Sequence, residues 1–531
     1  MRFFTFGLML FLTIAFTLLG AFVGWPWLLG LSLTLPLTLV GIVDLVQREH
    51  NVLRNYPILA RVRFLAEYIR HQVRQYFVES DIDGTPFDHN ERNIIYKRAR
   101  NISAAKPFGT ELDVYDEEYE WLNHSIAATR ERAVDDMPRV GIGGPQCDKP
   151  YSASVFNISA MSFGALGPHA IMALNKGASL GGFAHDTGEG GISPYHRKYG
   201  GDLIWEIGSG YFGCRNDDGG FNADMFRDQA RDEQVKMIEV KLSQGAKPGH
   251  GGLLPGAKVT AEIAAARKVA QGEDCISPSS HPAFSTPVGL LEFVARLREL
   301  SGGKPTGFKL CIGHRWEFLA VCKAMLETGI LPDFIVVDGA EGGTGAAPLE
   351  LSDGLGTPLR EGLLFAHNAL VGTGLREKIR IGASGKAVTG FRIAVNLAIG
   401  ADWCNSARGF MFSLGCIQSQ NCHTGRCPTG ITTMDPRRQR SLDVEDKARH
   451  VYRFHHHTVR ALGVVTSATG LDHPGELKPY HLNLRISSDE VRTAAEFYDY
   501  LQAGELVDGS AHPMYRRYWG MARADSFAPA L

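Results

Sequence analysis

Beyond residue 150, short β-rich runs alternate with longer helical segments, and this alternation constrains the fold more than any other feature of the 531-residue chain. Strands that alternate with helices form parallel βαβ units, and eight such units in about 250 residues are typical of a closed β/α barrel. We therefore predict an α/β fold, an eight-stranded β/α (TIM) barrel. The expected strands are 155–160, 182–186, 203–207, 237–242, 307–312, 333–338, 378–382 and 402–406, and the clearest helical patterns are 261–270, 287–300, 316–327 and 390–399.

The ends of the expected strands are rich in glycine. In order they read SAMSFGALG, HDTGEGG, GSGYFG, KLSQGAKPGHGGLLPG, FKLCI, VDGAEGGTGAAP, IGASGKAVTG and NSARGF. Functional residues of such barrels collect at these ends, and the loops after strands seven and eight commonly bind phosphate. Because glycine lets backbone amides approach an anionic or flat ligand, we expect a phosphorylated cofactor. The piece GSGYFG matches GxGxxG but opens no clear helix, so we do not interpret it as a nicotinamide-binding fingerprint.

Three closely spaced cysteines, Cys416, Cys422 and Cys427, indicate a metal cluster in a chain with only nine cysteines. Iron-sulfur clusters are held by thiolates, and three thiolates suit a three-iron cluster better than a four-iron one. Structural zinc is an alternative, but it needs a fourth ligand. His423 adjoins Cys422, so His450 or His455 would have to fold back. Inert cysteines are a further alternative, whereas a disulfide framework suits small secreted domains.

The N-terminus has the pattern of a membrane anchor. Residues 3–25 are an almost unbroken apolar run, and a second run covers residues 27–46. Each is long enough to span about 30 Å of hydrocarbon as a helix. Arginines flank the pair at both outer ends, which favours a transmembrane helical hairpin with both termini in the cytoplasm. A signal peptide and a single tilted span are the alternatives.

The predicted organisation has four parts. Residues 1–47 form the hairpin, 48–150 a juxtamembrane helical and irregular region, 151–430 the barrel with its cysteine loop, and 431–531 a helical extension. Within the second part, residues 57–80 have the pattern of a basic amphipathic helix that either lies on lipid headgroups or packs on the soluble region. The net charge of −2 gives no electrostatic case for binding nucleic acid.

Several long motifs occur together and in order: AMSFGAL, DTGEGG, KLSQGAKPGHGG, DGAEGGTGAAP and the cysteine run that ends in CPTG. On these motifs, residues 107–474 resemble the FMN-binding synthase domain of glutamate synthase, and more closely its short membrane-anchored forms. The resemblance implies an FMN-binding β/α barrel, with a three-iron four-sulfur cluster held by Cys416, Cys422 and Cys427. It thus agrees with the strand count and the ligand count.

The resemblance also implies positions for the cofactor and the substrate. FMN would contact the backbone around Ala160, Met161 and Ser162, with Ser209, Gln244 and Lys309 near its ring. Its phosphate would lie against Gly343, Gly345, Gly385, Ala407 and Arg408. Lys309 would stabilise negative charge on the reduced ring. The expected catalytic residues are Lys247, Arg267 and Lys309, because a dicarboxylate substrate requires cations; Arg267 has the alternative of a solvated helix residue.

The reaction implied by the resemblance is that of an oxidoreductase of the glutamate synthase type, which acts on a CH–NH2 group. 2-Oxoglutarate and ammonia form an imine, which hydride from reduced FMN converts to glutamate, with electrons supplied through the cluster. Three positions depart from the family. Leu253 replaces a glutamine, His169 replaces a glutamate, and Ser384 replaces a usual aspartate. Losing polar substrate contacts changes substrate choice, so the cofactor sites are better supported than the substrate.

The sequence carries no pattern of a glutaminase or nicotinamide-binding domain. We therefore expect free or partner-supplied ammonia, and an external electron donor such as ferredoxin or a membrane redox protein. The expected location is the inner (cytoplasmic) membrane, with the catalytic domain facing the cytoplasm. Two alternatives stay open: the same cofactors acting on a different amine or keto acid, and a membrane-tethered electron-transfer subunit.

Overall fold

The computed structural model describes residues 2–130 and 137–530, which divide into two compact units, Met1–His89 and Asn90–Leu531. In the first unit, helix α1 (Phe4–Phe22) packs directly against helix α2 (Leu31–Val46). The short 3-10 helix η1 (Trp25–Gly30) connects the two helices and contacts both. Thr13 Oγ1 and Thr38 Oγ1 lie 2.9 Å apart across the pair. The chain thus forms the predicted helical hairpin, whose insertion into a membrane stays a prediction.

Glycine allows the two hairpin helices to approach closely. A Cβ atom at Gly20 would lie 2.1 Å from Leu28 Cδ2, and one at Gly41 would lie 2.3 Å from Phe6 Cδ2. At the end of α2, the fully buried Asp44 accepts hydrogen bonds from Arg61, at 2.7 Å, and from the backbone of Ile58. The unit continues through α3 (Asn51–Asn55), α4 (Ala60–Val73) and the π-helix η2 (Arg74–Val78).

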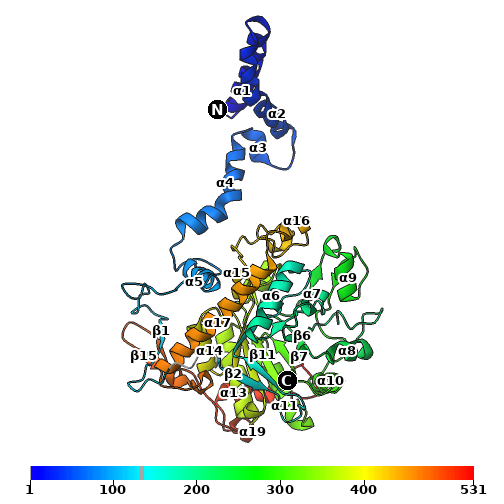
Figure 1. Cartoon of the computed structure of the whole chain (residues 1–531), viewed down its shortest axis with the longest axis vertical. Coiled ribbons are helices and arrows are strands. Elements are labelled where there is room, and N and C mark those ends of the chain that lie inside the picture. Colours follow the sequence, from blue (N-terminus) through cyan, green and yellow to red (C-terminus); the bar gives the residue numbers. More distant parts are fainter. Residues whose placement is uncertain (1, 131–136, 531) are drawn as a thin grey trace. The chain divides into compact units, whose positions relative to one another are not determined.

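The second unit contains the predicted barrel, which Figure 1 shows surrounded by its helices. Eight parallel strands close in the order β10-β11-β12-β13-β4-β5-β6-β7. The β/α barrel is therefore confirmed. The strands are β4 (Phe156–Ile158), β5 (His185–Asp186), β6 (Leu203–Ile207), β7 (Val235–Lys241), β10 (Thr306–Leu310), β11 (Phe334–Asp338), β12 (Arg380–Ser384) and β13 (Trp403–Ser406).

One strand begins and ends two residues later than the sequence predicts. β12 extends to Ser384 because its parallel pairing with β11 continues to the register Asp338↔Ser384. Ser384 is therefore part of the barrel wall. The helices around the barrel are α5 (His89–Ala99), α6 (Pro168–Gly181), α7 (Pro194–Arg197), α8 (Ala223–Ala230), α9 (Ala261–Arg267), α10 (Pro287–Leu300), α11 (Arg315–Thr328), α12 (Leu349–Gly354), α13 (Leu359–Gly372), α14 (Gly390–Ala398), α15 (Arg408–Ser413) and α16 (Pro436–Gln439).

The amino-terminal end of the barrel is closed by a hairpin of β2 (Arg139–Ile142) and β3 (Tyr151–Ser154). Its side chains join an apolar core inside the barrel. That core comprises Ile142, Tyr151, Ala153, Ala184, Ile204, Met237, Phe334, Val336 and Trp403. Burial of these side chains supplies the hydrophobic stabilisation of the barrel interior.

The barrel interior becomes charged two residues further along β5, β6 and β7. Because strand side chains alternate between faces, Asp186, Glu206 and Glu239 follow Ala184, Ile204 and Met237 on the inward side. These three carboxylates offer oxygens within 4.8 Å of one another, and all are buried. The ammonium of Lys309, from β10, pairs with Glu206 and lies 3.2 Å from Glu239. We call these four residues the interior charge cluster.

The charge cluster shifts the ionisation of its members. Burial raises the pKa of Glu239 to about 7, and Glu206 adds to the effect while Lys309 opposes it. Burial, followed by the charge of Glu239, also raises the pKa of Asp186 well above its ordinary value. Burial alone would lower the pKa of Lys309, but the three carboxylates together raise it well above its ordinary value. Lys309 is thus a permanent cation.

Segments outside the barrel complete the unit. The 25-residue helix α17 (Val444–Ala468) lies in the predicted helical extension 431–531 and packs on α6. A three-stranded sheet joins distant parts of the chain, since β1 (Glu120–Leu122) pairs with β14 (Leu482–Arg485), which pairs with β15 (Val491–Thr493). The remaining elements are β8 (Leu253–Leu254), β9 (Cys275–Ile276), η3 (Gly256–Lys258), η4 (Arg376–Lys378), η5 (Cys422–Thr424), η6 (Pro474–Glu476), η7 (Pro479–His481), α18 (Ala494–Phe497), α19 (Glu505–Asp508) and α20 (Pro513–Met521).

We expect Glu239→Gln to reduce the pH dependence of stability. The folded-state pKa of Glu239, about 7, lies above the ordinary value of 4.5. The folded chain therefore binds more protons between these values, and stability on the order of 3 kcal/mol is lost as the pH rises through this window. Thermal unfolding midpoints of the detergent-solubilised protein, measured from pH 5 to 8, should fall less steeply in the variant than in the unsubstituted protein.

The exposed Glu292 provides the matched control. Glu292→Gln should leave the slope of the midpoint against pH unchanged. An equally steep slope in Glu239→Gln would contradict the assignment of a raised pKa to this side chain.

Candidate active site

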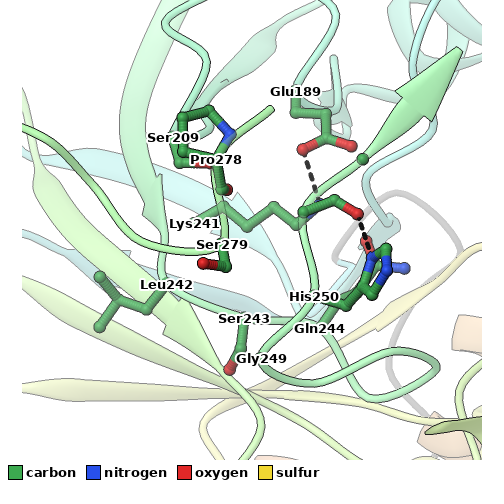
Figure 2. A pocket seen from close by; sticks show the side chains of 12 residues that line it. Glu189, Ser209, Lys241, Leu242, Ser243, Gln244, Gly249, His250, Pro278 and Ser279 are labelled. Atoms are coloured by element: carbon green, nitrogen blue, oxygen red, sulfur yellow. Dashed lines mark hydrogen bonds and ion pairs between the residues drawn. The ribbon is translucent and has the colours of Figure 1, made fainter. Parts of the chain in front are cut away.

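A pocket opens at the carboxyl ends of β6 and β7, where the loop after β5 also reaches it (Figure 2). It is open to solvent, and the empty space between its lining residues, part of which is open solvent, is about 310 Å³. Such strand ends are the usual location of functional residues in β/α barrels. The lining residues are Glu189, Ser209, Lys241, Leu242, Ser243, Gln244, Gly249, His250, Gly251, Gly252, Pro278 and Ser279.

An ion pair lies inside this pocket. Lys241 Nζ, at the end of β7, is 2.9 Å from Glu189 Oε2, and Figure 2 shows the two side chains pointing toward each other. Burial opposes the negative charge of Glu189, but Lys241, Lys247 and Arg267 outweigh it and lower the pKa of this carboxyl to about 2. Glu189 is therefore anionic at neutral pH.

Two of the three expected catalytic residues lie close enough to this carboxylate to affect its charge. The side chain of Lys247 forms no ion pair within the described residues, and burial lowers its pKa. Arg267 is 5% exposed, so it is not the solvated helix residue of the alternative interpretation. Its guanidinium donates to the carbonyl oxygen of Phe163 at 3.2 Å and lies over the Phe212 ring. The third, Lys309, belongs to the interior charge cluster.

The residues expected near the FMN ring come together in part. Ser209 and Gln244 both line the pocket. Residues 160–162 follow β4, and a Cβ at Gly188 would lie 2.6 Å from the backbone nitrogen of Ser162. Gly188 has φ +64°, so glycine allows the loops after β4 and β5 to touch. Lys309 lies in the barrel interior, on the strand that neighbours β7.

The residues expected at the FMN phosphate form a second group. A Cβ at Gly343 would lie 2.6 Å from Arg408 Cζ, and Arg408 Nη2 donates to the carbonyl oxygen of Glu341 at 2.9 Å. A Cβ at Gly385 would lie 3.3 Å from Glu341 Oε1. Ala407 precedes α15 at its N-cap. The loops after β11 and β13 thus meet at one guanidinium, and the loop after β12 reaches the neighbouring Glu341 side chain.

The cysteine loop follows α15 directly. Burial, together with the neighbouring Cys422 and Cys427, raises the pKa of Cys416 to about 12, so the three thiols interact electrostatically. A Cβ at Gly345 would lie 3.9 Å from Cys422 Cβ. The Lys258 ammonium donates to the carbonyl oxygen of His423. The loop therefore adjoins both the group around Arg408 and the segment that continues from the pocket.

The structure is less favourable to the zinc alternative. His455 is buried, bonds to Ser154 Oγ at 2.9 Å and stacks on Phe183, so it does not fold back on the cysteines. Two thiolates on one zinc lie at most about 4.6 Å apart, because the Zn–S bond is about 2.3 Å. Among the described residues, only Asp186, Glu206 and Glu239 bring three potential ligand atoms within 4.8 Å. The three sulfur atoms therefore do not all lie within 4.8 Å of one another.

The three departures from the family lie outside the pocket lining. Leu253 is 59% exposed and pairs with Ile276 across the two-stranded sheet of β8 and β9. His169 Nδ1 bonds to the carbonyl oxygen of Leu442 at 3.0 Å. Ser384 Oγ lies 3.3 Å from Ser159 Oγ within the barrel. None of the three side chains contributes polar groups to the pocket that the structure describes.

Sequence reasoning missed Glu189 and Lys241, the central pair of the pocket. Both lie in motifs that follow or end strands, DTGEGG and KLSQGAKPGHGG. Charged residues at two barrel strand ends are the signal that could have identified them. It also missed the carboxylates around Lys309, which lie on strands, Glu206 and Glu239 among apolar neighbours and Asp186 between His185 and Thr187.

Comparison with known proteins places the chain in a family. The model of a conserved region in glutamate synthase matches residues 109–472. The glutamate synthase large subunit-like protein YerD of Bacillus subtilis is 37% identical over 484 residues, which cover 84% of this chain and 92% of that protein. The archaeal glutamate synthase (NADPH) of Methanocaldococcus jannaschii is 36% identical over 295 residues, and the match spans 55% of this chain and 54% of the relative.

A structural comparison adds a more distant similarity. The flavin-binding domain of baker's yeast flavocytochrome b2 aligns with a TM-score of 0.40 and 11% identity, over 80% of this chain and 85% of that domain. The family match covers more than half of the chain, and the Bacillus protein aligns over nearly its whole length. This chain therefore belongs to the glutamate synthase family.

Proposed function

We propose that the protein is an FMN-dependent oxidoreductase of the glutamate synthase type, which reduces the imine of 2-oxoglutarate and ammonia to glutamate. Membership of the family supports the reaction class, as do relatives that are named glutamate synthases. The observation that carries the proposal is the charge around the pocket. Lys241, Lys247 and Arg267 act on one carboxylate, Glu189.

The charges complement a dicarboxylate. Lys241, Lys247 and Arg267 carry three positive charges, and Glu189 carries one negative charge. The excess of two positive charges matches the two negative charges of 2-oxoglutarate. Lys247, which has no ion-pair partner among the described residues, is free to bind one substrate carboxylate. Arg267 presents a guanidinium whose Nε has no hydrogen-bond partner in the described part of the chain. Such partly desolvated cations bind carboxylates strongly.

The residues present fit FMN. The close approach of Gly343 to Arg408 supplies backbone amides and a guanidinium for a phosphate, and Ala407 immediately precedes Arg408 at the start of α15. Gly345 and Gly385 would complete the phosphate site. Residues 160–162, Ser209, Gln244 and Lys309 would hold the ring, with Ser209 and Gln244 opening onto the pocket. Bound FMN would supply hydride from its ring and store two electrons. Lys309 stays protonated within its carboxylates and so offers a fixed positive charge toward the ring.

We also propose that Cys416, Cys422 and Cys427 hold a three-iron four-sulfur cluster. Cys422 and Cys427 both act on the pKa of Cys416, so the three thiols lie near one another, which supports a shared ligand. Thiolates are the protein ligands of such clusters. Since Gly345 lies near Cys422 and Gly343 lies near Arg408, one short loop joins this site to the proposed phosphate site. Electrons would come from an external donor, a ferredoxin or a membrane redox protein.

The hairpin would anchor the enzyme in the cytoplasmic membrane. Phe4–Phe22 and Trp25–Val46 have mean hydropathies of 2.1 and 2.0, and both are long enough to cross a bilayer. Arginines before the first span and after the second favour a cytoplasmic location for the catalytic unit.

A second function is favoured by one observation. Leu253 and His169 stand where the family has polar residues, and neither lines the pocket. The same cofactors would then act on another amine or keto acid. Reoxidation of the reduced flavin by a panel of keto acids with ammonium separates the two functions. Under the main proposal 2-oxoglutarate is the preferred substrate.

We expect the anaerobically reduced protein to form one glutamate per flavin on mixing with 2-oxoglutarate and ammonium. Lys247→Met should raise the KM for 2-oxoglutarate by roughly 10- to 100-fold, because a charged hydrogen bond contributes about 1.5–3 kcal/mol. Lys268→Met, next to Arg267 but exposed, is the matched control and should leave this KM unchanged. A flavin that stays reduced with 2-oxoglutarate, or an unchanged KM in Lys247→Met, would contradict the assignment.

We expect the purified protein to contain about three irons per chain and to give the electron paramagnetic resonance signal of an oxidised three-iron cluster. Cys416→Ser should lose the signal and most of the iron, since it removes one thiolate. Cys147→Ser is the control, because Cys147 lies half-buried elsewhere and bonds to the carbonyl oxygen of Gly303. One zinc per chain and no iron would instead support the zinc alternative.

We expect the full chain to remain in the membrane fraction after washing with alkaline carbonate. Residues 48–531 expressed alone should move to the soluble fraction, because each removed helix buries about 30 Å of apolar length in the bilayer. Release of the full chain by the wash would show that the hairpin does not span the membrane.

A further inference from the structure

Glu189 has no role in the proposed binding of substrate carboxylates, yet it occupies the pocket. Among the described residues that line the pocket it is the one acidic residue, and its side chain is 19% exposed. An anion next to three cations weakens the binding of a dianionic substrate, so its presence calls for a different partner. This inference rests on the proposed function and concerns the same pocket.

One oxygen of Glu189 is available to a ligand. Oε2 pairs with Lys241, but no hydrogen bond to Oε1 is found among the described residues. A Cβ at Gly252 would lie 2.9 Å from Oε1, so a side chain at this lining position would cover that oxygen. Glycine at residue 252 therefore leaves Oε1 facing the pocket. Because Glu189 remains ionised at neutral pH, Oε1 accepts hydrogen bonds and donates none.

We propose that Glu189 binds the nitrogen end of the substrate and thereby selects an imine over a keto acid. A protonated imine carries a positive charge and two N–H donors, both complementary to a carboxylate. The oxygen of a keto acid carries neither and presents lone pairs that the carboxylate repels. The substrate carboxylates bind the cations, and the nitrogen binds Glu189.

The chemistry balances without proton transfer to Glu189. Bound, reduced FMN would supply a hydride, which would form a new C–H bond at the carbon of the protonated imine. The π pair of the C=N bond would become the lone pair of a neutral amine, and one proton from solvent would give the ammonium group of the amino acid. Hydride addition to a keto acid would place an alkoxide against the carboxylate, which raises the barrier to the 2-hydroxy acid. Lys241 positions Glu189 through its ion pair.

The first test measures binding to the oxidised full-length protein in detergent. L-Glutamate and glutarate have the same two carboxylates, but only glutamate carries an ammonium group. In Glu189→Gln we expect the Kd of glutamate to rise about tenfold or more, since a charge-assisted hydrogen bond is lost. Glutarate should bind equally well or more tightly. Glu292→Gln should change neither Kd, and flavin content checks that each variant is folded.

The second test measures products. The reduced Glu189→Gln protein, given 2-oxoglutarate and ammonium, should form less glutamate and a larger fraction of 2-hydroxyglutarate than the unsubstituted protein, because an amide can donate to a keto oxygen. Glu189→Asp keeps the charge and should retain most of the preference for the imine, which separates loss of the charge from general damage.

Three results would overturn the inference. The first is an unchanged Kd for glutamate in Glu189→Gln. The second is an equal loss of glutamate and glutarate binding, which would assign Glu189 to pocket structure. The third is an unchanged ratio of products. If the unsubstituted reduced protein forms no glutamate, the proposed function itself fails. If the unsubstituted protein forms glutamate and the Glu189→Gln variant matches it in binding and products, the proposed function stands. Only the proposed role of Glu189 is then rejected.

Discussion

One buried ammonium organises the part of the barrel on which the pocket depends. Lys309 meets Glu206 and Glu239 inside the barrel, and Asp186 lies within reach of both carboxylates. Ionised carboxylates so far from water are costly unless they are paired. The four residues come from β5, β6, β7 and β10, which are neighbours in the closed sheet. Removing the lysine would leave three carboxylates without a buried counter-charge.

The same strands carry the pocket. Glu189 follows β5, Ser209 follows β6, and Lys241 ends β7. The interior charge cluster joins these strands through buried side chains, and the pocket above it carries an excess of cations. The barrel thus has an apolar layer at its amino-terminal end, then a buried layer in which one ammonium pairs with carboxyl groups, and then the pocket with its excess of cations.

Periodicity was sufficient to predict the eight strands, because each is a short apolar run followed by glycine or polar residues. It also predicted the bounds of α10, residues 287–300. The end of β12 was not predictable, since its last pairs depend on a neighbouring strand 46 residues earlier at Asp338. Helical hairpin formation followed from two apolar runs around Pro26.

The candidate site was predictable only where a motif supplied it. Cysteine spacing indicated one site, and the family motifs indicated Lys247, Arg267 and the glycines near Arg408. The Glu189–Lys241 pair joins residues 52 positions apart, and Lys309 meets Glu206 from 103 positions away. No local sequence pattern encodes such long-range contacts, because they form only when the barrel closes. The burial of Arg267 could not be predicted from the sequence either, because a seven-residue helix has no clear exposed face.

The sheet of β1, β14 and β15 has a consequence for dissecting the chain. β14 is its central strand and bonds on one side to residues 120–122, more than 350 positions earlier. A fragment that ends after the cysteine loop would leave β1 as an unpaired edge, and it would also strip α17 from the aromatic side chains of Phe156, Phe183 and Phe410. Exposed edges and uncovered aromatic rings promote aggregation. If a minimal barrel is insoluble, the cause would thus be the loss of the covering elements α17, β14 and β15, not an intrinsic failure of the barrel to fold.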